Sequence, residues 1–286
     1  MTDANSMSDT NIEVAIAAPN VAVVTLARPP VNALGRAIRE AMLRVFDRLE
    51  ASAEVRCIVL TASGHVFCAG ADIKEKQVLG AADGDYVRAN RLTRDAFFCI
   101  VDSSKPVIAA VNGAALGAGF VLAACCDMIL AADTAVFGMP EIDVGQGGGA
   151  SVLQRILPPS KVRRMMLTGE RVPAAELYRL GAVEACLPAA ELLPAAIALA
   201  STIAAKRTAA VRRIRGSFFA VEALDMREGF HSEQVYTTEL SMSPDGVEAR
   251  RAFFEKRKPA FGAPATGAPV GDGAGFDKTA RDTTGG

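Results

Sequence analysis

The stretch KPVIAAVNGAALGAGFVLAACCDMIL, residues 105–130, decides the fold, because a strand, a glycine-bearing turn, a helix and another strand follow one another in it. Pro106 to Val111 is a continuous apolar run, which is typical of a strand covered on both faces. Asn112-Gly113 is a turn signal that leads into a helical stretch from Leu116 to Cys126, and Met128 to Ala131 is strand again. This succession indicates an α/β protein.

The alternation extends to both sides of that stretch. Ile12 to Ala17 and Val21 to Leu26 have the pattern of a β-hairpin. Apolar residues from Leu34 to Leu49 recur at helical spacing, with charged residues, Arg39 among them, on the opposite, polar face. Cys57 to Thr61 is a buried strand, and a helical stretch over about 85–102 follows. Beyond about residue 150 helical periodicity dominates, so we expect a helical C-terminal third.

Composition excludes several classes of function. The 286 residues carry 31 basic and 32 acidic side chains, and a net charge of −1 gives no field that would attract nucleic acid or an anionic membrane. No apolar run reaches the roughly 20 residues of a bilayer span, and the first dozen residues lack the features of a signal peptide. We therefore expect a cytoplasmic protein.

The sequence offers no obvious metal site. The six cysteines form no CxxC pair, which favours reduced, buried thiols. His65 and Cys68 are separated like metal ligands, but His231 is the one other histidine in the sequence, so nothing completes a zinc-type set. We expect neither a metal nor a bound cofactor.

Two glycine-bearing segments, Phe67–Lys74 and Asn112–Phe120, each follow a buried strand and lead toward a helix. Backbone N–H groups at such a turn can stabilise an anionic oxygen. The alternative is that the glycines serve only tight turns and close packing. A dinucleotide fingerprint fits poorly because the third glycine is out of place, and no GK[ST] phosphate loop occurs.

Three motifs, in this order, resemble those of the crotonase (enoyl-CoA hydratase/isomerase) superfamily: Phe67–Lys74, Lys105–Gly119 and Phe137–Ile142. Further similarity lies in Leu167-Thr-Gly169, Gly181 and the Glu255-Lys-Arg-Lys258 ending, so that the resemblance runs from roughly Val21 to Phe261. It implies an enzyme that holds an acyl-CoA thioester, with coenzyme A entering as part of the substrate.

The resemblance also implies a fold, which is an α/β spiral of β-β-α turns with a helical C-terminal trimerisation region. We expect a disordered N-terminus over residues 1–11, a crotonase-like core over 12–200 and the helical trimerisation region over 201–261. The Gly-, Ala-, Pro- and Thr-rich tail over 262–286 has little to bury and should be disordered. The expected partners are an acyl-CoA molecule and copies of the chain in a homotrimer or dimer of trimers.

Site residues carry over from the resemblance position by position. The backbone N–H groups of Ala71 and Ala118 match the family's oxyanion hole, and Ala118 stands where many relatives have glycine. Coenzyme A contacts fall on eight residues: Arg28, Ala69, Ala71, Asp72, Ile73, Lys74, Phe253 and Lys256. For Arg28 and Lys256 the alternative is a solvated surface charge, and for Phe253 a place in the core.

The carboxylates bear on the reaction. Family hydratases use two glutamates, and here one position is Glu141 whereas the other falls on Val121, whose side chain has no proton to exchange. One carboxylate is sufficient to move a proton from the α- to the γ-carbon, so we expect an isomerase with Glu141 as its base. Asp143, two residues on, would point the same way as Glu141 if the segment were extended, although a loop role is the simpler interpretation.

Other interpretations stay open at this stage. Hydration of a 2-enoyl-CoA by Glu141 is the main alternative, followed by other enolate chemistry of the superfamily such as dehalogenation, decarboxylation or C–C cleavage. The loss of the second glutamate at Val121 also fits a catalytically silent acyl-CoA-binding homologue. Gln146 and Ser151, in a loop that departs from the family pattern, are further candidates for contact with the acyl group.

Overall fold

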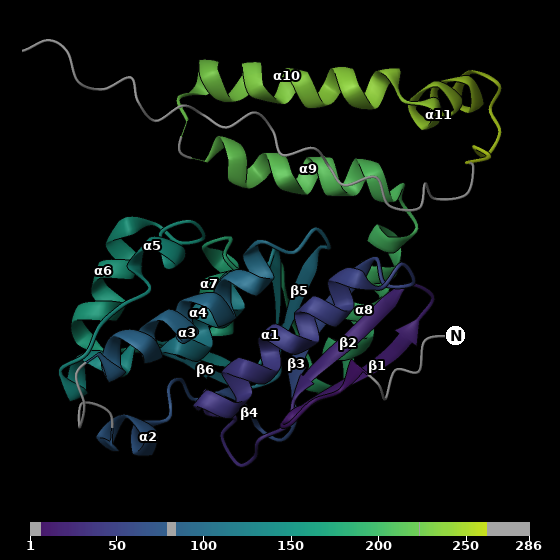
Figure 1. The fold of residues 1–286 in the computed structure, drawn as a ribbon. Helices are drawn as coiled ribbons and strands as arrows, with labels where there is room; N and C mark the ends of the chain where they lie inside the picture. Colours follow the sequence, from purple (N-terminus) through teal and green to yellow (C-terminus); the bar gives the residue numbers. More distant parts are fainter. Residues whose placement is uncertain (1–6, 79–83, 223, 262–286) are drawn as a thin grey trace, which may run out of the picture. The chain divides into compact units, whose positions relative to one another are not determined.

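A computed structural model describes residues 7–78, 84–222 and 224–261 (Figure 1). Its main sheet has six strands in the order β1-β2-β3-β5-β7-β10. The first pair is an antiparallel hairpin and every other pair is parallel. The strands are β1 (Ile12–Ala18), β2 (Val21–Leu26), β3 (Cys57–Ala62), β5 (Val107–Val111), β7 (Met128–Ala132) and β10 (Ala185–Leu187).

A second sheet of short strands takes up the segments that follow the main strands. Its order is β4-β6-β8-β9, and the first three strands are parallel to one another. The strands are β4 (Val66–Cys68), β6 (Ala114–Leu116), β8 (Val136–Gly138) and β9 (Arg171–Pro173). Because β3, β5 and β7 are each followed by a short strand and then a helix, the chain winds in β-β-α turns, and the predicted crotonase-like spiral is confirmed.

Helices cover the sheets. α1 (Arg36–Ala51) lies beside α3 (Asp85–Val101), and α8 (Ala189–Ala204) lies along β1, β2, β3, β5 and β7 (Figure 1). The smaller helices of the spiral are α2 (Ile73–Val78), α4 (Ala118–Ala124), the 3-10 helix η2 (Pro140–Val144), α5 (Ala150–Leu153), α6 (Pro159–Thr168) and α7 (Ala174–Arg179). The last helices are α9 (Thr208–Val221), α10 (Met226–Met242) and α11 (Pro244–Phe254).

The buried core contains the apolar runs from which strands and a helix were predicted. All six residues of β3 and all five of β5 are buried, since both faces of these parallel strands are covered. On α1 the apolar residues from Ile38 to Leu49 face inward, as the helical spacing predicted. Arg39 departs from that pattern, because it is a cation predicted on the polar face and yet is 7% exposed.

The chain divides into two compact units, Met1–Glu233 and Gln234–Gly286. The predicted boundary at 200/201 falls earlier, between Ala200 and Ser201 within α8, a helix that packs on the main sheet. Residues 7–11, predicted to be disordered, are packed in the structure, since Met7 is 3% exposed and its carbonyl accepts a hydrogen bond from Arg48. The predicted disorder of residues 1–6 and 262–286 concerns segments outside the described residues.

No single helix among the described residues has both the length and the hydropathy of a membrane span. α8 and α9 have both together, across a bend of 108°, and α8 is packed against the main sheet.

Candidate active site

A cavity of about 470 Å³ lies where the predicted site residues converge. Ala71, Ala118, Val121 and Glu141 line it on one side, and successive turns of α3 from Tyr86 to Phe98 line it on the other. These residues come from three turns of the spiral, so the fold rather than the sequence brings them to one place.

The two glycine-bearing segments meet backbone to backbone. Gly70 has φ +98°, and a Cβ built on it would lie 2.9 Å from the Leu116 carbonyl oxygen and 3.4 Å from the Ala118 nitrogen. Only glycine allows this approach. As a result Ala71, the next residue along the chain, and Ala118, the first residue of α4, are neighbours at the cavity wall.

The N–H groups of Ala71 and Ala118 are suited to bind an oxygen. Within the described residues, no carbonyl or side chain accepts a hydrogen bond from either of them. Ala118 heads a helix, where the first N–H groups have no partner inside the helix. Two such donors side by side can stabilise a developing negative charge. Their role as an oxyanion hole stays a prediction.

Glu141 lies against the same turn. It belongs to η2, and a Cβ built on Gly117 would overlap its Oε1 atom and lie 2.6 Å from its Cδ atom. The carboxyl group therefore occupies the space that a side chain at Gly117 would fill, one residue before the Ala118 N–H. The backbone N–H of Gln146 donates to the Glu141 carbonyl oxygen at 2.9 Å and holds the following loop in place.

Val121 stands one turn into α4 and is 5% exposed. A Cβ built on Gly149 would collide with its Cγ2 atom, so the loop 145–149 packs directly on the valine side chain. Hydrocarbon thus occupies the position at which the resemblance predicts the second carboxylate of a hydratase. Gln146 and Ser151 both line the cavity, which is where the sequence placed them.

Asp143 does not join this group. The segment around it is a 3-10 helix with three residues per turn, so side chains two residues apart diverge, and the extended geometry considered for it is wrong. Its carboxylate lies toward Gly169, where a built Cβ would be 3.2 Å from Oδ2, and Asp143 is absent from the cavity lining.

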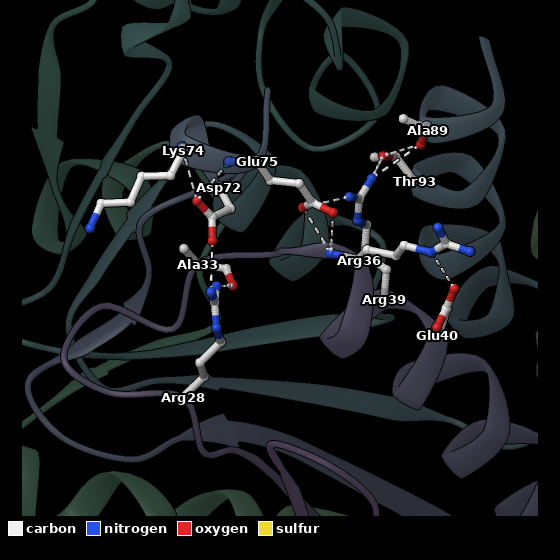
Figure 2. Close-up of polar contacts among 10 residues, drawn as sticks. All are labelled: Arg28, Ala33, Arg36, Arg39, Glu40, Asp72, Lys74, Glu75, Ala89 and Thr93. Atoms are coloured by element: carbon white, nitrogen blue, oxygen red, sulfur yellow. Dashed lines mark hydrogen bonds and ion pairs between the residues drawn. The ribbon is translucent and has the colours of Figure 1, made fainter. Parts of the chain in front are cut away.

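An ion pair holds the loop that carries Ala71 (Figure 2). The Arg28 guanidinium donates to Asp72 Oδ2 at 2.7 Å, and the Lys74 N–H donates to Asp72 Oδ1 at 3.0 Å. The Arg28 hydrogen bond lowers the pKa of Asp72 below its ordinary value. By accepting the Lys74 N–H, Asp72 acts as a cap at the start of α2. Ile73 and Lys74 are exposed beside it. The Ala69 N–H donates to the Val31 carbonyl.

A second network on the same loop was missed by the sequence. Both Glu75 oxygens accept the Arg36 backbone N–H, at 3.0 and 2.8 Å, and Glu75 Oε2 accepts Arg39 Nη2 at 3.1 Å. The Arg39 Nη1 group donates to Thr93 Oγ1 at 2.6 Å and to the Ala89 carbonyl at 3.1 Å, which reaches α3 (Figure 2). No local pattern pairs residues so far apart in the sequence.

Phe253 and Lys256 belong to the second unit. The Phe253 ring packs edge to face on Phe254, with centroids 6.0 Å apart, and Lys256 has φ +52° just after α11. Their predicted contacts with coenzyme A stay predictions. Among the residues described, no three His, Cys, Asp or Glu side chains cluster as metal ligands.

Comparison with known proteins decides the family. Residues 17–264 match the enoyl-CoA hydratase/isomerase family. A carnitinyl-CoA dehydratase of Proteus mirabilis is 35% identical over 84% of this chain and 94% of its own. The chain belongs to the enoyl-CoA hydratase/isomerase family. The resemblance inferred from the motifs is thereby confirmed.

Solved structures agree with this assignment. A Mycobacterium smegmatis enoyl-CoA hydratase, 31% identical, superposes with a TM-score of 0.84 over 88% of this chain and 99% of its own. Among other relatives, a (7aS)-7a-methyl-1,5-dioxo-2,3,5,6,7,7a-hexahydro-1H-indene-carboxyl-CoA hydrolase of Rhodococcus jostii is 36% identical over 84% of this chain and 92% of its own. This enoyl-CoA hydratase/isomerase family member is therefore an acyl-CoA-processing enzyme, and its relatives' names cover hydration, dehydration and hydrolysis.

Proposed function

We propose that the chain is an enoyl-CoA isomerase that moves a double bond from the β,γ to the α,β position with Glu141 as its one proton shuttle. The supporting observation is the neighbourhood of Glu141, whose carboxyl group lies against Gly117 beside the Ala118 N–H while Val121 fills the second carboxylate position.

The proposed reaction begins at the α-carbon of a 3-enoyl-CoA. Glu141 removes a proton there, the electron pair delocalises into a dienolate, and the thioester oxygen accepts hydrogen bonds from the Ala71 and Ala118 N–H groups. The protonated Glu141 then returns the proton to the γ-carbon as the α,β double bond forms. Nothing is oxidised or reduced, and no water is consumed.

Recognition of coenzyme A is proposed for the rim of the cavity. Ala69 and the segment from Ala71 to Lys74 would follow the pantetheine and adenine there, and Arg28 would meet a phosphate. In the second unit, Lys256 is proposed to meet a phosphate and Phe253 the acyl group or adenine. Arg28 also has a structural task because it holds Asp72, so its loss would disturb the loop as well as any phosphate contact.

Hydration is the second candidate, supported by relatives such as the probable enoyl-CoA hydratase of Mycobacterium bovis, which is 36% identical. It would need Glu141 alone to hold and deprotonate a water molecule. The contact between Val121 and the loop at Gly149 weighs against it, since an apolar surface there offers water no partner.

A panel of 3-enoyl- and 2-enoyl-CoA thioesters tests the proposal. Wild type should isomerise the 3-enoyl series, and Glu141→Gln should lower kcat by about 10²- to 10⁴-fold, as expected for loss of a general base. Val121→Glu should raise hydration of 2-enoyl substrates above the wild-type level. Rapid hydration by wild type would favour the second candidate, and tight binding without turnover would indicate a silent homologue.

We also propose that the chain forms a homotrimer or a dimer of trimers. Apolar side chains on the last helices of the first unit are exposed, and Ile214, Phe218 and Phe230 have 51%, 57% and 63% of their surface accessible. Such a row of exposed apolar groups marks an interaction surface. Multi-angle light scattering should give three or six times the 29.8 kDa chain mass, and a monomer would contradict this.

A further inference from the structure

The guanidinium of Arg39 is an unusual component of the cavity wall. Its side chain is 8% exposed, yet it lines the cavity. It donates three hydrogen bonds, to Ala89, Thr93 and Glu75, whereas an arginine carries five N–H donors. Nε is buried from solvent and has no acceptor within the described part of the chain, so the donor left for a ligand is the Nη2 N–H beyond the bond to Glu75.

The surroundings of Arg39 are polar as well. Asn90 and Ser151 line the same cavity, and among the residues described neither side chain forms a hydrogen bond with another protein group. A plain alkyl chain laid against this wall would remove donors from water without replacing their partners. A ligand oxygen would accept the remaining Nη2 N–H.

The charge of Arg39 is already balanced by a carboxylate. Glu75 lies 3.1 Å from Arg39, with 26% of its side chain exposed, and the pair as a whole is neutral. A ligand carboxylate would gain Arg39 but meet the negative charge of Glu75. A neutral oxygen, such as a hydroxyl or a ketone, meets no such repulsion and accepts a hydrogen bond from the cation.

We propose that this enzyme acts on acyl-CoA thioesters whose acyl group carries a neutral oxygen, a hydroxyl or ketone, that accepts a hydrogen bond from Arg39. Arg39 is then a specificity-determining residue at the wall of the cavity. The inference rests on the proposed function, because it assumes that this cavity receives the acyl group.

The experiment compares 3-enoyl-CoA thioesters of equal length that end in a methyl, a hydroxymethyl, a ketone or a carboxylate group, over a series of lengths. At the best length, wild-type kcat/KM should favour the hydroxyl or ketone over both the methyl and the carboxylate by at least about 10-fold, as a hydrogen bond to a charged donor implies.

The double variant Arg39→Met/Glu75→Gln removes both charges, while the glutamine oxygen can still accept the Arg36 N–H at the start of α1. The double variant should lose the preference for the hydroxyl or ketone substrates. If the double variant does not fold, Arg39→Lys should lose the same preference, because lysine lacks the planar guanidinium donors. Arg36→Gln is the matched control, since that side chain is 75% exposed and outside the cavity lining. It should keep the wild-type ratio.

A wild-type preference for the methyl or carboxylate series would overturn the inference while leaving the proposed isomerase intact. If wild type turns over none of the thioesters, the proposed function fails, and the inference is decided by binding. Dissociation constants of the saturated methyl- and hydroxyl-ended thioesters, measured by calorimetry, should then differ by the same factor in favour of the hydroxyl, and equal constants would overturn it.

Discussion

Gly117 shows how one residue without a side chain controls a site. Its φ of +54° disfavours any other residue, and the Glu141 carboxyl group fills the space beside its Cα. The same residue precedes the Ala118 N–H, so the proposed base and the proposed oxyanion donor depend on one turn.

Replacing Gly117 with alanine should therefore displace Glu141. We expect kcat to fall by about 100-fold, because small misplacements of reacting groups have effects of that size. Gly181→Ala is the control, since Gly181 also has positive φ, +79°, but no atom lies within 4 Å of a built Cβ. Steady-state kinetics and Tm are measured for both variants. An effect of backbone strain should appear in both, whereas an effect of the overlap with Glu141 should appear only in Gly117→Ala. Near-wild-type kcat in Gly117→Ala would contradict this placement of Glu141.

At the scale of elements, the C-terminal end of α1 depends on a residue from another segment. The Lys105 Nζ group donates to the carbonyls of Leu49 and Ser52, and the lysine is 1% exposed. Burial lowers the pKa of Lys105 to about 8. A motif residue at the start of β5 thus caps a helix more than 50 residues earlier in the chain.

This lowered pKa predicts a pH dependence of stability. Between about pH 8 and 10.5 the unfolded chain binds a proton at Lys105 that the folded chain has lost, so the contribution of Lys105 to the free energy of unfolding rises with pH. Relative to Lys105→Met, wild type should gain on the order of 2 kcal/mol from pH 8 to 10. Urea unfolding at both pH values measures the difference, and a constant or falling difference would refute the assignment.

At the scale of the whole first unit, α9 is tied to the spiral by one buried cation. Arg215 pairs with Asp127 at 3.0 Å and donates to the carbonyls of Ile100 and Val101 at 2.9 and 3.0 Å, at the end of α3. It also bonds to the Ser103 carbonyl, and its side chain is 6% exposed. Through Arg215, α9 is thereby linked both to the end of α3 and to Asp127, which directly precedes β7.

Removing this cation should destabilise the fold strongly. Arg215→Met leaves the largely buried Asp127 carboxylate with only the Val107 N–H as a partner and takes the donor away from three carbonyls, so we expect a loss of about 3–5 kcal/mol in the free energy of unfolding. Arg36→Gln, which breaks the exposed pair with Glu40, should cost less than about 1 kcal/mol. Chemical denaturation of both variants provides the test, and equal effects would argue against the buried network.

Much of this protein follows from the sequence by itself. The continuous apolar runs of β3 and β5, the helical spacing of α1 and the order of the three motifs determined the elements and the family. The two glycine-bearing segments were recognisable as possible sources of backbone donors, and the resemblance assigned these donors to Ala71 and Ala118. Local patterns suffice wherever the physical requirement is local.

Which residues the site side chains contact was decided by the tertiary structure alone. It placed the Glu141 carboxyl group against Gly117, turned Asp143 away through a 3-10 helix, and buried Arg39 between Glu75 and Thr93. The sequence put Arg39 on a solvated face because helical periodicity shows which side chains share a face but not what covers that face. Contacts between segments from different turns of the spiral depend on how those turns stack, and no spacing within one segment encodes that.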